Sequence, residues 1–190
     1  MSDRVLVVGD AALYRKLARM LRAEGYGEVY HAQGAEEAFE TYRLKRPEIV
    51  IMDNELQEGD PLALVGRIVA EAPAPVVMHS SYDQIDRVLE ADELGVSAHL
   101  FGTVTKENLL GAIRLGRTRF RICQTLRAEI GDCRETLRVR KLIERAKGIL
   151  MKRNRMGEDE AFIKIQKTAR DNNLSMEKVA QSIITANDII

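Results

Sequence analysis

The sequence contains no tryptophan, only two cysteines and only four prolines among 190 residues. Two cysteines are too few for a disulfide framework, and no cysteine and histidine cluster has the spacing of a zinc site. No apolar run approaches the roughly 20 residues that a membrane-spanning helix needs, and the N-terminus lacks the pattern of a secretory signal. We therefore expect a cytoplasmic protein of one or two domains, each able to bury its own core.

The formal net charge is zero, but the charges are unevenly distributed along the chain. Residues 1–105 contain 10 basic and 18 acidic side chains, a balance of −8, whereas residues 106–190 contain 19 basic and 11 acidic ones, a balance of +8. Such asymmetry is typical of a protein in which one half faces nucleic acid. Two domains of opposite charge that face each other, or a chance division, would give the same numbers.

Short apolar runs alternate with helical patterns over the first hundred residues. The runs predict buried strands at residues 4–8, 29–32, 48–52, 75–78 and 97–101. Apolar residues at helical spacing predict helices at residues 11–24, 35–45, 61–70 and 83–94. This alternation predicts an α/β fold, a doubly wound five-stranded parallel sheet covered by helices on both faces.

From Lys106 to about Arg153 the sequence has no proline, and helical periodicity dominates. A 3-4 spacing predicts two heptads of a coiled-coil seam formed by Cys123, Leu126, Ile130, Cys133 and Leu137. Helices predicted at 139–153, 158–171 and 175–187 would form a small three-helix domain. The chain thus divides into three predicted parts, residues 1–120, 121–138 and 139–190.

Two carboxylates follow strands at one edge of the predicted sheet. Asp10 follows the first strand and Asp53 the third, and ligands bind at the carboxyl ends of such strands. Hard oxygen ligands suit Mg²⁺, and with a metal bound Asp53 could accept a phosphoryl group that Ser80 hydrogen-bonds. Simple helix caps or loop acids would use the same residues. His79 and His99 lie beside this pocket, but no third residue has metal-ligand spacing, so we expect the histidines to be structural.

Four sequence blocks end the predicted strands, namely Val7–Asp10, Ile49–Asp53, Pro75–Ser80 and Gly95–Leu100. In order and spacing they resemble response-regulator receiver domains, over residues 4 to about 120. The resemblance implies a flavodoxin-like fold with Asp53 as the phosphoacceptor and Ser80 as the switch hydroxyl. It also implies a Mg²⁺ ion held by Asp10, Asp53 and the main-chain carbonyl of Glu55.

The chain departs from the receiver pattern at three places. Gly9 stands where receivers carry the first of two adjacent acids, Gly102 stands at the position of a lysine, and His99 replaces the aromatic switch residue. Loss of one charge-stabilising donor such as that lysine typically costs on the order of 10²–10³ in rate. Lys106, four residues further on, could reach back toward the pocket. The domain is therefore either phosphorylated at Asp53 or a pseudo-receiver that binds a partner without phosphorylation.

A second set of blocks lies in the basic C-terminal part, namely Ile143–Arg153, Glu158–Phe162, Ile165, Gln166, Ala169 and Val179–Ile184. They resemble the ANTAR domain of RNA-binding transcription antitermination regulators. The resemblance implies that this part binds paired hairpins in a nascent leader transcript and prevents an intrinsic terminator from forming. The whole chain is similar to the antiterminators of nitrate assimilation and amide use.

Residues 134–190 carry 13 basic and 8 acidic side chains. Such a face can bind several phosphates with strongly salt-dependent affinity, although a solvated face has the same composition. The predicted RNA contacts are Lys147, Lys152, Arg153, Arg155, Lys164, Lys167 and Arg170. The family motif supports Lys147, and charge and spacing suggest the others. Phe162 falls in an apolar row and is expected in the core, whereas Gln166 could face either way.

These features predict a non-enzymatic regulator that binds leader RNA and forms a homodimer in its active state. Its receiver-like domain would switch it, either through phosphorylation of Asp53 by a sensor kinase or through a ligand-sensing inhibitory protein. Three other interpretations remain open. The chain could be a pseudo-receiver interaction module, or a DNA-binding response regulator, because three short helices can resemble a helix-turn-helix. A phosphatase built on the acidic pocket would lack a second adjacent carboxylate and the lysine.

Overall fold

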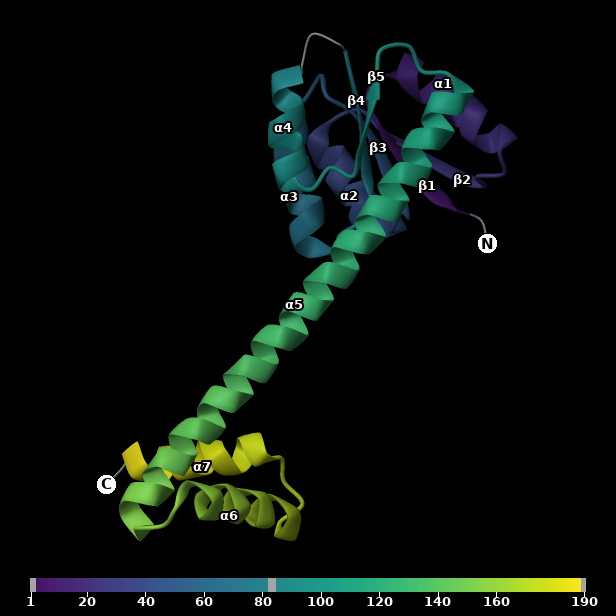
Figure 1. Ribbon diagram of the computed structural model, residues 1–190. Coiled ribbons are helices and arrows are strands. Elements are labelled where there is room, and N and C mark those ends of the chain that lie inside the picture. The colour runs from purple at the N-terminus through teal and green to yellow at the C-terminus, as the bar shows by residue number, and fades with distance from the viewer. Residues whose placement is uncertain (1–2, 82–84, 189–190) are drawn as a thin grey trace. The chain divides into compact units, whose positions relative to one another are not determined.

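The computed structural model describes residues 3–81 and 85–188 (Figure 1). The chain divides into two compact units, residues 1–124 and residues 125–190. Helix α5 (Lys106–Asn154) begins in the first unit and ends in the second. Within the described ranges, no helix is both long enough and apolar enough to cross a membrane. Each unit has its own core.

The first unit is built on a five-stranded parallel sheet. Its strands are β1 (Arg4–Val8), β2 (Glu28–Ala32), β3 (Ile49–Asp53), β4 (Val76–Ser80) and β5 (Ala98–Phe101). They lie in the order β2-β1-β3-β4-β5, and every neighbouring pair is parallel. The predicted doubly wound five-stranded sheet is therefore confirmed, with β3 at its centre.

Helices cover both faces of this sheet. They are α1 (Ala11–Ala23), α2 (Ala35–Lys45), α3 (Pro61–Glu71), α4 (Ile85–Leu94) and the first turns of α5. Side chains alternate along each strand, so Leu6 and Met52 belong to a core with α2, α3 and α4. Val7 and Ile51 point the other way, into a core with α1 and α5. The first two residues of the helix predicted at 83–94 lie outside the described residues.

The second unit consists of the C-terminal part of α5, α6 (Glu158–Asp171) and α7 (Met176–Asp188). Its small core is formed by Ala146, Ile165, Ala169, Val179, Ala180 and Ile184. The three helices thus bury one apolar stripe each, as their sequence spacing predicts.

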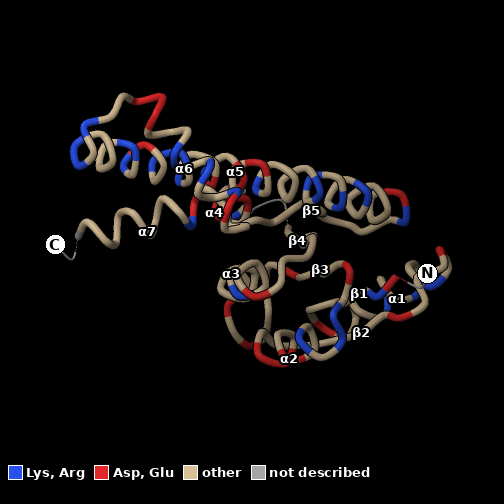
Figure 2. The backbone as a smooth tube through the Cα atoms, turned by 90° about the horizontal axis from the view of Figure 1, so that it is seen from below, with Lys and Arg blue, Asp and Glu red and all other residues tan. Residues whose placement is uncertain are grey.

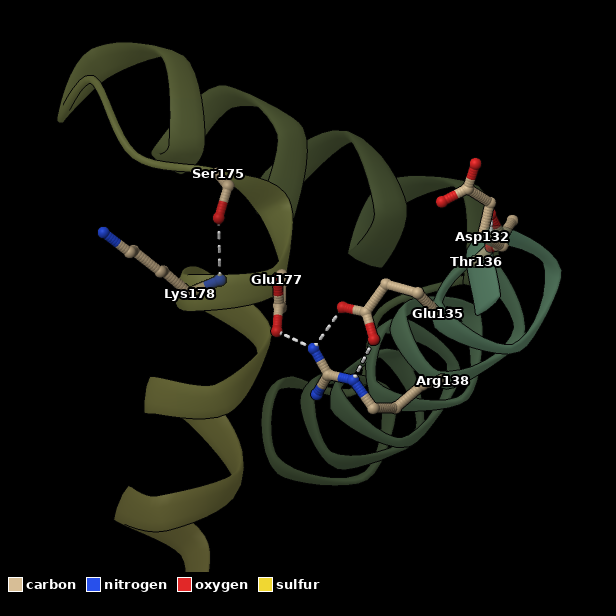
Figure 3. A network of polar contacts seen from close by, with 7 residues as sticks. All are labelled: Asp132, Glu135, Thr136, Arg138, Ser175, Glu177 and Lys178. Atoms are coloured by element: carbon tan, nitrogen blue, oxygen red, sulfur yellow. Dashed lines mark hydrogen bonds and ion pairs between the residues drawn. The ribbon is translucent and has the colours of Figure 1, made fainter. Parts of the chain in front are cut away.

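Polar contacts fix the start of α7 (Figure 3). The Ser175 hydroxyl accepts a hydrogen bond from the backbone N–H of Lys178 at 3.2 Å, which makes Ser175 the N-cap of α7. Arg138 on α5 donates to Glu135 on its own helix and to Glu177 in the first turn of α7. This ion pair joins α5 to α7 through two residues that are 39 positions apart in sequence.

We predict that Ile165→Ala destabilises the second unit by about 2–4 kcal/mol, because Ile165 is fully buried and its loss leaves a cavity. Hydrogen exchange of peptides from α6 and α7 measures this as faster exchange. Ile163→Ala is the matched control, since Ile163 on the same helix is 58% exposed and its truncation should change little. Equal effects of the two substitutions would contradict the assigned core.

Candidate functional site

Asp53 is the last residue of the central strand β3 and lies at the carboxyl edge of the sheet. Its Oδ1 atom accepts a hydrogen bond from the backbone N–H of Glu55 at 3.2 Å. Its Oδ2 atom lies 3.6 Å from Nδ1 of His79. The side chain remains 24% exposed, so the carboxylate is held in place and still accessible from solvent.

Asp10 lies at the end of β1, in the adjoining loop. It is the N-cap of α1, where its Oδ1 atom accepts a hydrogen bond from the backbone N–H of Leu13 at 2.7 Å. Before it, Gly9 has a φ of +153°, and a Cβ built there would lie 3.0 Å from Leu13 Cδ2 and 3.3 Å from Asp53 Cβ. A side chain at position 9 would therefore need these neighbours or the backbone to move. Receivers carry an acidic residue at position 9, whereas here the backbone of Gly9 lies close to Asp53.

The donors for a magnesium ion are fewer than in the receiver pattern. Among the described residues, no group of three histidine, cysteine or acidic side chains is placed to hold a metal. The possible magnesium ligands are the carboxylates of Asp10 and Asp53 and the main-chain carbonyl of Glu55. Because Mg²⁺ is often held by one or two carboxylates and several waters, this donor set fits a water-rich site of low affinity.

Ser80 is the last residue of β4, the strand that pairs with β3. It is only 2% exposed, and its hydroxyl has no hydrogen-bond partner within the described part of the chain. A buried hydroxyl without a partner typically costs about 1–3 kcal/mol. This unsatisfied hydroxyl ends the strand that pairs with β3, so Ser80 stays a candidate for the switch hydroxyl.

The sequence interpretation missed the role of His79, which it took to be structural. Strand register places His79 opposite Asp53. Its Nε2 atom lies 3.0 Å from the carbonyl oxygen of Gly102, and because a carbonyl can only accept, Nε2 carries the proton. Nδ1 then faces the Asp53 carboxylate, and this contact raises the pKa of His79 against the opposing effect of burial. Pairing strands β3 and β4 in the right register would have been needed to find it.

Lys106, the predicted substitute for the lysine missing from the receiver pattern, has another partner. Gly102 has a left-handed backbone, with φ at +64°, a conformation that glycine adopts without cost. The ammonium group of Lys106 pairs with Glu24 on α1.

The predicted switch residue His99 bonds Asp92 of α4 through Nε2 at 3.0 Å and stacks with Phe101. It thus connects β5 to α4.

The structure argues against an RNA contact at Lys147. The residue is 7% exposed, and its ammonium group lies 2.8 Å from a carboxylate oxygen of Glu144 on α5 and 2.8 Å from one of Glu158 on α6. These contacts raise the pKa of Lys147 and lower that of Glu158. Lys147 of the family motif therefore links α6 to α5 through ion pairs. The number of charged residues in the sequence could not distinguish this role from phosphate binding.

The other six predicted contacts are exposed, namely Lys152, Arg153, Arg155, Lys164, Lys167 and Arg170. No ion pair to an acidic side chain is found for them within residues 3–81 and 85–188. Figure 2 shows basic residues along α6 and at the end of α5.

The expectation for Phe162 was wrong, because 41% of it is exposed and it lies outside the described core of the unit. Gln166 is exposed.

We predict that His79 titrates above the ordinary value of 6.5 and that Asp53→Asn lowers its pKa. A raised pKa means that this contact stabilises the folded unit at low pH and that the contribution is lost as the pH rises through the raised value. Imidazole resonances in a ¹H–¹⁵N NMR titration measure it. Asp92→Asn, beside His99 of β5, is the control and should leave the His79 titration unchanged. An unaltered His79 curve in Asp53→Asn would refute the assigned contact.

Two family models match the chain. The response regulator receiver domain matches residues 5–114, and the ANTAR domain matches residues 131–184. The receiver fold also aligns with solved structures. The receiver domain of NtrX from Brucella abortus covers 60% of this chain and 98% of its own, at 31% identity and a TM-score of 0.54. A receiver domain protein from Clostridium thermocellum, at 19% identity and a TM-score of 0.58, shows the same fold.

The transcriptional regulatory protein PdtaR of Mycobacterium tuberculosis is 38% identical over 182 residues, which cover 95% of this chain and 89% of PdtaR. A protein-glutamate methylesterase/protein-glutamine glutaminase of Rhodopseudomonas palustris is 34% identical over 128 residues, but these cover only 34% of that enzyme. The similarity to the enzyme is thus partial, whereas that to PdtaR includes both family matches. The resemblance to receiver and ANTAR domains is confirmed, and the chain belongs to the ANTAR-domain response regulators of two-component systems.

Proposed function

We propose that this protein is a signal-responsive regulator that binds hairpins in nascent leader RNA and prevents transcription termination. Its domain order, a receiver followed by an ANTAR domain, supports this proposal. In our proposal, residues 1–120 receive the signal, residues 121–138 link the parts as a coiled coil, and residues 139–190 bind the RNA. The observation that carries it is the set of six exposed basic side chains, Lys152, Arg153, Arg155, Lys164, Lys167 and Arg170, for which no ion pair is found among the described residues.

These side chains suit a polyanion. Lys164, Lys167 and Arg170 follow one another at intervals of three residues along α6, and all are exposed. Exposed basic groups without acidic partners are available to bind phosphates and release counterions. Lys152, Arg153 and Arg155 extend the basic surface to the end of α5 and the turn that follows. Together the six side chains form the proposed RNA-contact surface.

The receiver pocket supports a switch at Asp53. A phosphoryl group on the accessible carboxylate would lie beside the buried hydroxyl of Ser80 and the imidazole of His79. Mg²⁺, held by Asp10, Asp53 and the Glu55 carbonyl, would neutralise charge on the phosphoryl group during transfer. In this proposal the phosphoryl donor is a sensor kinase or a small phosphodonor.

A pseudo-receiver is the second candidate for this unit. It is favoured by Gly9, where a side chain would crowd Asp53, and by the absence of a lysine at Gly102. In that case a sensor protein binds the receiver and controls RNA binding without phosphorylation.

We further propose that the active form is a homodimer joined along α5. The predicted seam residues Leu126, Ile130 and Leu137 are each more than half exposed. Cys123 and Cys133, in the same 3-4 spacing, are exposed too. A second copy of the helix would bury this apolar stripe, because residues spaced three and four apart share one face.

The first test is a fluorescence-anisotropy titration of the full chain against a two-hairpin RNA, selected from a pool with randomised loops, and a matched duplex DNA. We expect RNA-selective binding that Mg²⁺ with acetyl phosphate strengthens in wild type and not in Asp53→Asn. RNA binding indifferent to the phosphodonor would support the pseudo-receiver. Failure to enrich any RNA, or binding to duplex DNA that RNA does not compete away, would overturn the proposal.

We predict that substitutions of two lysines in the C-terminal unit affect different quantities, the salt dependence of RNA binding and the thermal stability. Lys164→Ala should reduce the slope of log K against log salt by about one, because one phosphate contact is lost. Lys147→Met should keep this slope and lower the thermal midpoint of the unit, because it leaves Glu144 and Glu158 without their cation. Circular dichroism and the same titration measure both effects. A reduced salt slope with an unchanged midpoint in Lys147→Met would restore Lys147 as an RNA contact.

A further inference from the structure

One row of exposed side chains on α6 combines three different chemistries. Phe162, Gln166 and Arg170 are four residues apart in succession, and all three are exposed. On a helix, residues at this spacing are neighbours, with their Cβ atoms about 5–6 Å apart. The row therefore presents an aromatic ring, an amide and a guanidinium group side by side, on a helix held in place by its buried residues Ala161, Ile165 and Ala169.

The exposed ring of Phe162 lies between the acidic first turn of α6, Glu158–Glu160, and a basic stretch that follows. Between Ala161 and Arg170 the sequence has three basic side chains and no acidic one. A single exposed apolar residue is common on protein surfaces and means little alone. Here the ring is the one aromatic side chain in residues 139–190, and it lies in line with an amide that can both donate and accept hydrogen bonds.

We infer that Phe162 is a stacking platform for an unpaired base of a bound RNA hairpin. The Gln166 amide would bond the edge of that base, and the Arg170 guanidinium would bind an adjoining phosphate. Proteins read RNA sequence mainly in unpaired loop bases, by stacking and by edge hydrogen bonds. The positive charge of this stretch favours a polyanion over an apolar protein partner. This inference rests on the proposed RNA binding and assigns its base-reading residues.

The test uses the full chain and the RNA selected above, with 2-aminopurine placed at each loop position in turn. Truncation of a stacking aromatic generally weakens single-strand binding about 5- to 100-fold. We expect a loss in this range for Phe162→Leu, with an unchanged salt slope, and near wild-type affinity for Phe162→Trp. Ile163→Ala is the matched control, because Ile163 is 58% exposed on the same helix but lies off the row. It should bind as wild type.

Fluorescence supplies a readout that a structural role would not change. One 2-aminopurine position should be quenched by wild type and by Phe162→Trp, and not by Phe162→Leu. Gln166→Leu should keep the quenching and reduce discrimination among bases at that position. Wild-type binding with equal affinity and equal quenching in Phe162→Leu would overturn the inference and leave the proposed function intact. Absence of any RNA binding by the wild type would overturn both.

Discussion

A parallel sheet has to be buried on both faces, because each crossover connection places a helix against it. In this chain that requirement makes β3 apolar through Met52, and Asp53 is the first residue that can carry a charge. The same requirement ends β1 at Val8, two residues before Asp10, and ends β4 at Ser80, so the polar residues that follow or end three neighbouring strands lie at one edge. The pocket at Asp53 is a consequence of how the core is closed.

Around Asp53 this sequence has neither of two charged side chains that receivers carry, and other groups contact the carboxylate instead. Receivers place an acid and a lysine near the acceptor, whereas here Gly9 brings backbone close to Asp53 and a histidine faces its free oxygen. The Nε2 atom of His79 donates a hydrogen bond to the carbonyl of Gly102, and its Nδ1 atom lies 3.6 Å from the carboxylate. One imidazole ring thus lies between Asp53 and the carbonyl of Gly102, in the segment that leads into α5.

The periodicity of the sequence was sufficient to predict the strands, the helices and the position of Asp53, since burial on two faces leaves long apolar runs. Contacts that depend on register or on the packing of two helices could not be predicted in this way. His79 faces Asp53 because β3 and β4 pair in one particular register, and Lys147 is buried because Glu158 of another helix reaches it. Phe162 was misplaced because it lies at the margin of an apolar row whose centre is Ile165.

The left-handed backbone at Gly102 bears on which residues this position can accept. Glycine adopts this conformation freely, whereas for other residues it costs roughly 1–2 kcal/mol. A lysine at position 102 would have to adopt this strained conformation, in a residue whose carbonyl accepts a hydrogen bond from His79. Replacing Gly102 by lysine is therefore expected to destabilise the receiver unless the backbone of this turn changes with it.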